Sequence, residues 1–224
     1  MKIMYLESKK KNLDFDISNL DFSMLPKKVG IVYTIQFRPF IAPLKKALQD
    51  SGRKVFMGKG FRGKYEGQVL GCDAGAAIYI IDKVDCFLFL SSGKWHAERT
   101  MLSLPKEKPF FILTAKGIEE VRSDLKEQRK KMLSKFYFSE RIGILVSTKA
   151  GQESMKNAID AKDRMEKMGK KAFLFISDMI NPLEFENFKI DFWINTACPG
   201  LAFDFPKMIN YEELELKAIK SAKK

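Results

Sequence analysis

Residues 28–33 read KVGIVY and residues 141–147 read RIGILVS. Each is a short, continuous apolar run, as expected for a strand that is buried on both faces of a sheet. Apolar residues recur at helical spacing after each run, and Gly52 and Gly169 mark the ends of the two predicted helices. Because strands that alternate with helices are typical of βαβ units, the sequence predicts an α/β fold with parallel sheets.

Further apolar runs continue this pattern in both halves of the chain. We predict strands at residues 55–57, 85–90, 109–114, 172–176 and 191–195, a short helix at 74–81 and a long helix from about 118 to 135.

The two halves also match in detail. VGIVYTIQ parallels IGILVSTKAGQ, DSGRKVFM parallels KMGKKAFLF, and VDCFLFLSSG parallels IDFWINTACPG. The period is too long for a solenoid and indicates a duplicated domain. We therefore predict two duplicated three-layer α/β domains with small parallel sheets, at residues 26–117 and 118–224, after a remnant strand and connector at 1–25.

The composition excludes several classes of protein. The 224 residues include 46% hydrophobic residues, one histidine and three cysteines, which suits a folded core and a reducing, cytoplasmic location better than a secreted disulfide scaffold. The sequence shows no signal peptide and no apolar run long enough to span a membrane. A single histidine excludes most histidine-based zinc sites and argues against Ser-His-Asp catalysis.

The net charge is +12 and is spread along the chain. The densest basic run, residues 122–141, also contains acidic residues, so we interpret it as the solvated face of a helix. The charge favours an anionic partner, such as an acidic protein or an RNA-associated complex. A nucleic-acid module typically adds a recognisable fold motif or exposed aromatics between its basic residues, whereas the aromatics here lie mostly inside apolar strands, so specific nucleic-acid binding is not expected.

Residues 58–63 read GKGFRG and match the G-x-G-x-x-G pattern. A dinucleotide-binding fingerprint follows the first strand and opens a helix, whereas this segment follows the second predicted strand and precedes no helical pattern. We interpret it as a flexible glycine loop that could present Lys59 and Arg62 to an anion.

The three cysteines lie in different surroundings. Cys86 lies inside a predicted strand and is expected in the core. Cys72 precedes a predicted helix, whose N-terminal amides would favour its thiolate, and Cys198 follows the strand at 191–195. Loops beyond the carboxyl ends of parallel strands form the ligand crevice, so the two loop cysteines could share a site. The alternative is two unrelated structural or free thiols.

Two further loops are predicted at the same edges. His96 follows the strand at 85–90, although a lone histidine is more often a packing or hydrogen-bonding residue than a catalyst. Lys149, Gly151 and Gln152 lie between the first strand and helix of the second half, a position that commonly holds anionic groups. The alternative for these three is a helix-capping turn.

Six stretches of the chain carry a family resemblance. They are GQVLGCDAGAA, VSTKAGQ, NTACPG, VDCFLFLSSGKWH, PKKVGIVYTIQF and KMINYEELE. They resemble the archaeal and eukaryotic diphthamide-synthesis enzymes, which transfer a 3-amino-3-carboxypropyl group from S-adenosylmethionine, and the resemblance runs from about residue 25 to 214.

The resemblance implies a cofactor and a set of site residues. Family members have three small α/β domains that each give one cysteine to a [4Fe-4S] cluster. The reduced cluster cleaves S-adenosylmethionine, and the resulting radical adds to a histidine of translation elongation factor 2. Cys72 and Cys198 match two of these ligands, and Cys86 matches none. Cofactor-binding positions are implied at Ser92, Gly93, His96, Lys149, Gly151 and Gln152, with no catalytic residue assigned.

The chain departs from this family pattern in two ways. The first domain and its cysteine have no counterpart apart from MKIMYLES, and Gly200 stands where family members usually have arginine. We therefore expect a subunit that works with a longer homologous chain, or as a homodimer, to modify elongation factor 2, the partner supplying the missing ligand. The alternatives are a non-catalytic scaffold or electron-relay subunit, and a nucleotide- or RNA-binding α/β module.

Overall fold

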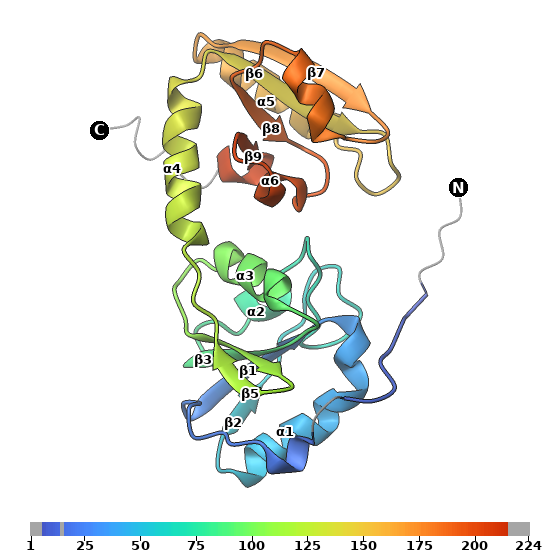
Figure 1. Cartoon of the computed structure of the whole chain (residues 1–224), viewed down its shortest axis with the longest axis vertical. Coiled ribbons are helices and arrows are strands. Elements are labelled where there is room, and N and C mark those ends of the chain that lie inside the picture. The colour runs from blue at the N-terminus through green and yellow to red at the C-terminus, as the bar shows by residue number, and fades with distance from the viewer. Residues whose placement is uncertain (1–5, 14–15, 215–224) are drawn as a thin grey trace. The chain divides into compact units, whose positions relative to one another are not determined.

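The structure is a computed structural model that describes residues 6–13 and 16–214. It divides the chain into two compact units, residues 1–125 and 126–224 (Figure 1). Each unit contains one β-sheet, and no helix in the described ranges is long and apolar enough to cross a membrane.

The sheet of the first unit has five strands in the order β2-β1-β3-β4-β5. Their bounds are β1 (Lys28–Tyr33), β2 (Lys54–Phe56), β3 (Cys86–Leu90), β4 (Phe110–Thr114) and β5 (Gly117–Glu120). The first four strands in this order are parallel, and β5 is antiparallel to β4. The inner strands are buried on both faces, which explains their continuous apolar sequences.

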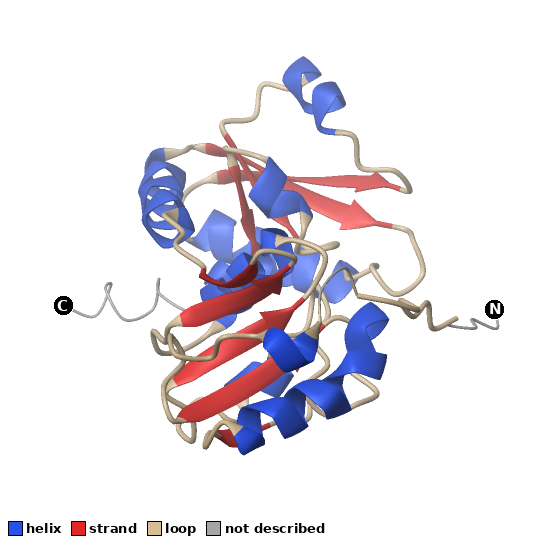
Figure 2. Cartoon of the chain, turned by 60° about the horizontal axis from the view of Figure 1, so that its bottom comes forward, coloured by secondary structure: helices blue, strands red, loops and turns tan. Residues whose placement is uncertain are grey.

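Helices cover both faces of this sheet (Figure 2). Helix α1 (Ile41–Asp50) packs Leu44 and Leu48 on the face that carries Ile31. Helices α2 (Gly75–Ile78) and α3 (Lys94–Ser103) pack alanines on the opposite face, which carries Val32 and Phe87. The unit therefore has the predicted three layers.

The second unit contains a four-stranded parallel sheet in the order β7-β6-β8-β9. Its elements are α4 (Leu125–Phe138), β6 (Arg141–Ser147), α5 (Met155–Lys167), β7 (Lys171–Ser177), the 3-10 helix η3 (Pro182–Asn187), β8 (Phe192–Asn195), α6 (Leu201–Asp204) and β9 (Met208–Asn210). Helices α4 and α5 pack on one face, and α6 and η3 pack on the other.

The strand orders confirm the predicted duplication, since β2-β1-β3-β4 and β7-β6-β8-β9 are the same arrangement. Gly30 pairs with Phe87 and Gly143 pairs with Trp193 at corresponding register positions. A Cβ atom on Gly30 would lie 2.8 Å from the Phe87 ring, and one on Gly143 would overlap the Trp193 ring. In both halves, glycine therefore makes room for a large aromatic ring on the neighbouring strand.

An aspartate before the third strand also has the same role in each half. The carboxylate of Asp85 accepts a hydrogen bond of 3.1 Å from the backbone amide of Lys28. The carboxylate of Asp191 accepts one of 2.8 Å from the amide of Arg141. Each aspartate thus fixes the start of the first strand of its unit.

The structure corrects the predictions around residue 118. The helix predicted from 118 to 135 begins only at Leu125, because residues 117–120 form strand β5. Gly117, with φ of +110°, allows the tight turn from β4, and Ile118 pairs with Leu113. The expected domain boundary at 117/118 would cut this strand, whereas the compact units divide after residue 125.

The beginning of the chain is described only in part. Residues 1–5 of the strand suggested at the N-terminus lie outside the described residues. The predicted connector contains a short 3-10 helix, η1 (Ile17–Asn19), and the buried side chains of Phe22 and Leu25 belong to the core beside α1.

Candidate functional site

The segment that carries Cys72 folds back along the carboxyl end of β1. The backbone amide of Tyr33 donates to the Gly67 carbonyl, and the amide of Val69 donates to the Tyr33 carbonyl, both at 2.9 Å. Cys72 follows three residues later and is exposed. The structure therefore places it at the strand ends, where ligand sites of parallel sheets form.

Asp73, next to Cys72, organises this segment. Its buried carboxylate accepts hydrogen bonds from the backbone amides of Arg62 at 2.6 Å, Gly63 at 3.3 Å and Gly75 at 2.8 Å. These bonds tie the glycine loop to the start of α2. Asp73 was not among the predicted site residues, although an aspartate two residues before a helix start is a common turn-forming signal.

The glycine loop at residues 58–63 is packed, so its interpretation as a flexible loop is wrong. A Cβ on Gly58 would overlap the Ala76 carbonyl, and a Cβ on Gly60 would lie 2.9 Å from the Asp73 carboxylate. These glycines therefore allow a close approach of the loop backbone to α2.

The two basic side chains of this loop contact groups within the unit. The Lys59 ammonium donates to the Lys64 carbonyl. The Arg62 guanidinium lies 3.9 Å from the Cys72 sulfur, measured from Nη1 to Sγ. A guanidinium at this position complements a negatively charged sulfur, which is the form that binds iron.

Trp95, in the first turn of α3 directly after the loop that follows β3, contacts the Cys72 segment. A Cβ on Gly71 would lie 3.3 Å from the Trp95 ring, so the two segments are in contact. Ser92 and Gly93 are exposed in this loop. The Trp95 and His96 rings are 4.7 Å apart. The structure thus brings the predicted loop of Ser92, Gly93 and His96 beside that of Cys72.

The environment of His96 lowers its pKa. Burial is the larger cause, because it disfavours the charged imidazolium, and the positive charge of Arg99 adds to it. Arg99 is buried, with its guanidinium 4.9 Å from the centre of the Trp95 ring. The His96 imidazole therefore stays neutral to a lower pH than that of a free histidine.

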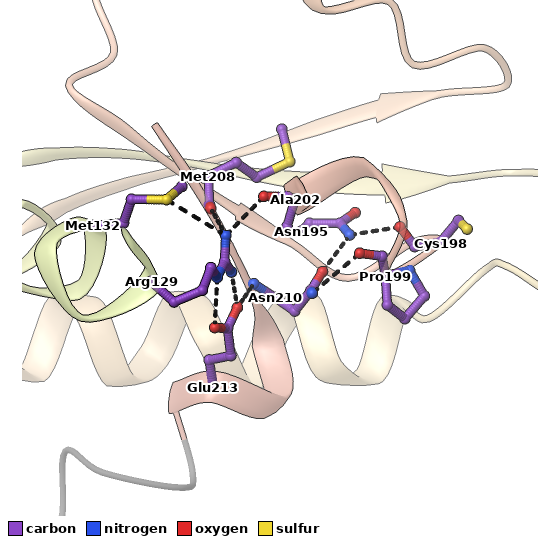
Figure 3. A network of polar contacts seen from close by, with 9 residues as sticks. All are labelled: Arg129, Met132, Asn195, Cys198, Pro199, Ala202, Met208, Asn210 and Glu213. Carbon is purple, nitrogen blue, oxygen red and sulfur yellow. Dashed lines mark hydrogen bonds and ion pairs between the residues drawn. The ribbon is translucent and has the colours of Figure 1, made fainter. Parts of the chain in front are cut away.

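Cys198 is half-buried in the loop that follows β8. Nδ2 of Asn195 donates to the Cys198 carbonyl and to Oδ1 of Asn210, both at 2.8 Å (Figure 3). Nδ2 of Asn210 donates to the Pro199 carbonyl at 3.2 Å. Two buried asparagines therefore support the backbone of the loop that presents the thiol.

A partly buried ion pair contacts one of these asparagines. The guanidinium of Arg129 pairs with the Glu213 carboxylate, which also accepts the Asn210 backbone amide at 2.7 Å. Nη1 of Arg129 donates to the carbonyls of Ala202 at 2.7 Å and Met208 at 3.0 Å. Arg129 lies within the basic run that we interpreted as a solvated helix face; that interpretation is wrong for this residue, because it is only 7% exposed.

Lys149, Gly151 and Gln152 form an exposed turn between β6 and α5. The Gln152 amide donates to the Lys149 carbonyl at 3.0 Å, and Gly151 has a φ of +80°. This turn ends two residues before Ser154, the N-cap residue of α5. The turn follows β6, which pairs with β8, so it and the Cys198 loop leave the same edge of the second sheet.

Cys86 is fully buried in β3, which confirms the prediction of a core residue. Burial, together with the nearby charge of Asp85, raises the pKa of its thiol to about 12. Burial therefore disfavours the thiolate, which is the form that binds metal ions.

The donor set fits an iron-sulfur cluster in part. Each unit offers one loop thiol, Cys72 or Cys198, whereas most clusters are held by four cysteines. Within residues 6–13 and 16–214, no three His, Cys, Asp or Glu side chains group as a metal site. The two thiols also occupy different loops of the duplicated fold. Phe87 and Trp193 hold the same register position, and Ser92 follows Phe87 by the same interval at which Cys198 follows Trp193, so Ser92, and not Cys72, is the counterpart of Cys198.

Known proteins share the fold and the sequence pattern. The 2-(3-amino-3-carboxypropyl)histidine synthase of Pyrococcus horikoshii is 24% identical over 207 residues, which cover 91% of this chain and 57% of that protein. Subunit 1 of the enzyme of that name from Encephalitozoon cuniculi is 26% identical over 189 residues, covering 81% of this chain and 52% of the subunit. The chain spans about half the length of these relatives.

A solved structure and a family model agree with these matches. The crystal structure of Dph2 from Pyrococcus horikoshii with a 4Fe-4S cluster has the same fold, with a TM-score of 0.77 and 24% identity, over 86% of this chain and 57% of that one. The family model described as "Putative diphthamide synthesis protein" matches residues 1–217. The chain therefore belongs to the diphthamide synthesis protein family.

Proposed function

We propose that this chain is a subunit of the enzyme for the first step of diphthamide synthesis. The reaction transfers a 3-amino-3-carboxypropyl group from S-adenosylmethionine to a histidine of translation elongation factor 2. A [4Fe-4S] cluster would supply the electron for cleavage of the sulfonium. The proposal is supported by family membership and by the names of the relatives.

The observation that carries the proposal is the placement of two cysteines in braced loops at strand ends. Cys72 lies beside the buried carboxylate of Asp73, and Cys198 lies beside the buried amide of Asn195. We assign both thiols as cluster ligands. Because two thiolates are fewer than such a cluster needs, a partner chain, either a longer homologue or a second copy, would supply the missing cysteine.

The remaining loop residues would bind S-adenosylmethionine, which carries a carboxylate and cationic groups. Lys149 is exposed and could pair with the carboxylate, while Gly151 and Gln152 present backbone at the same turn. Ser92, Gly93 and His96 border the Cys72 segment through Trp95. We assign these six residues to substrate positioning and none to bond cleavage.

Anaerobic reconstitution with iron and sulfide tests the proposal directly. We expect a [4Fe-4S] absorption and EPR signal when the chain is mixed with a longer homologous subunit, together with transfer of the aminocarboxypropyl group to elongation factor 2. Cys72→Ala and Cys198→Ala should each weaken both readouts, and Cys86→Ala is the matched control because Cys86 is a core residue. A cluster and activity that persist in both ligand variants would contradict the metal role.

A second candidate function is a non-catalytic scaffold or electron-relay subunit of the same complex. The observation that favours it is the incomplete ligand set, together with a net charge of +12 that would attract an acidic partner. Complementation separates the candidates: a scaffold keeps its function in the double variant Cys72→Ala/Cys198→Ala, whereas a cluster-binding subunit loses it.

A further inference from the structure

Three successive residues of the Cys198 loop are bonded to asparagine side chains. The Ala197 amide donates to Oδ1 of Asn195 at 3.0 Å, and Nδ2 of Asn195 donates back to the Cys198 carbonyl at 2.8 Å. The Pro199 carbonyl accepts from Nδ2 of Asn210 at 3.2 Å. The backbone on both sides of the thiol is therefore fixed, and the sulfur points away from the asparagines (Figure 3).

The chemistry of these contacts requires amides. Nδ2 of Asn195 uses both of its hydrogens, one for the Cys198 carbonyl and one for Oδ1 of Asn210, while its Oδ1 accepts the Ala197 amide. Only a side chain that donates twice and accepts once satisfies this arrangement. Asn195 is 1% exposed and Asn210 is 7% exposed, so water cannot readily replace a lost partner.

Arg129 and Glu213 fix the asparagines from the other side. Glu213 accepts the backbone amide of Asn210, and Arg129 bonds to Glu213 and to the carbonyl of Ala202, just beyond the Cys198 loop. The Arg129–Glu213 pair thus connects α4 to two points in the chain. One is Ala202, just after the Cys198 loop, and the other is Asn210, in β9. Such outer contacts commonly orient metal-binding side chains.

We propose that Asn195 and Asn210, supported by the Arg129–Glu213 ion pair, are positioning residues that set the orientation and accessibility of the Cys198 thiol. The bonds act on the backbone of the free chain, so the thiol is oriented before any metal binds. The role of the thiol as a cluster ligand rests on the proposed function, whereas its orientation by the asparagines does not.

Alkylation of the metal-free full chain tests the proposal. Asn195→Asp keeps the size of the side chain but removes both donated hydrogens. We expect the iodoacetamide reaction of Cys198, followed by mass spectrometry, to accelerate about tenfold, which corresponds to the loss of roughly one buried hydrogen bond. Cys72 in the same molecule should keep its rate, and the exposed Asn187→Asp is the matched control. Unchanged Cys198 reactivity in folded Asn195→Asp would overturn the proposal.

Two further measurements are added. The first needs no variant, so it tests the proposal even if Asn195→Asp does not fold, and the second separates the proposal from the proposed function. Hydrogen exchange in the unmodified chain should show a protected Ala197 amide, and exchange at the rate of an unstructured peptide would overturn the proposal. With the cluster reconstituted beside a longer homologue, folded Asn195→Asp should change the EPR line shape, and an unchanged line shape would contradict the positioning role. Faster alkylation with no cluster signal in the unmodified complex would support the positioning role and contradict the proposed function.

Discussion

The indole ring of Trp95 lies edge-on to the imidazole of His96, with ring centres 4.7 Å apart and planes at 80°. Burial lowers the pKa of His96 below its usual value, and the charge of Arg99 acts in the same direction. Because His96 is the only histidine, NMR titration of its ring protons reports this pKa without ambiguity. We expect a value below 6.5, and a value at or above 6.5 would contradict the described environment.

The lowered pKa of His96 also predicts how stability changes with pH. The unfolded chain binds a proton at His96 near pH 6.5, while the folded chain binds it only at lower pH. The free energy of unfolding should therefore rise with pH across this window and level off above about pH 6.5. Trp95→Ala should move the pKa back toward 6.5 by admitting water, whereas Tyr79→Ala, at another exposed aromatic residue of the unit, should not.

Asp73→Ala should destabilise the first unit by about 1–3 kcal/mol in urea denaturation, because three backbone amides lose a buried acceptor. The glycine loop should also become cleavable by trypsin after Lys59 and Arg62. Asp82→Ala is the matched control, since Asp82 is exposed and pairs with the exposed Lys106. Equal resistance of the two variants to trypsin would show that Asp73 does not hold the loop.

Gly143→Ala should destabilise the second unit by about 1–3 kcal/mol, because the added methyl group overlaps the Trp193 ring in a packed core. Gly93→Ala should change stability by less than about 0.5 kcal/mol, since its Cβ would meet no atom within 4 Å. Thermal unfolding of the two variants makes the comparison. Gly143→Ala should cost less stability when residue 193 is leucine than when it is tryptophan. An equal loss of stability in both backgrounds would exclude the overlap with the Trp193 ring as the cause.

Thiol titration should separate the three cysteines. At pH 8, Cys72 and Cys198 should react with a disulfide reagent in the folded chain, whereas Cys86 should react only after unfolding. Its pKa of about 12 also means that the unfolded thiol loses its proton first, so stability should fall as pH rises above 9. Cys86→Ala should remove the slow-reacting thiol, and a fast third thiol in the folded chain would contradict its burial.

The sequence predicted the strands that are buried on both faces, because such strands leave continuous apolar runs such as residues 28–33 and 141–147. It did not predict β5 or β9. Residues 117–120 read GIEE and residues 208–210 read MIN, and segments this short carry no distinct periodicity. They become strands only because neighbouring strands offer free edges for pairing.

The loops of the candidate site were predictable for a different reason. Strand ends in a parallel sheet mark ligand positions, so the loops of Cys72 and Cys198 could be singled out from the strands before them. The residues whose side chains hold these loops in place could not be predicted from the sequence. Arg129 is distant in sequence from Glu213, and only the folded second unit shows that this basic residue of α4 is buried and pairs with it.

The different loop positions of Cys72 and Cys198 bear on how the two halves of the chain diverged. When the two halves are aligned by strand register, Gly30 corresponds to Gly143 and Asp85 to Asp191, but Ser92 corresponds to Cys198. An exact second copy of the first half would thus preserve the sheet and lack the Cys198 thiol. Duplication of one domain explains the shared sheet, but it does not explain the cysteines. Cys72 and Cys198 must have arisen separately in the two halves.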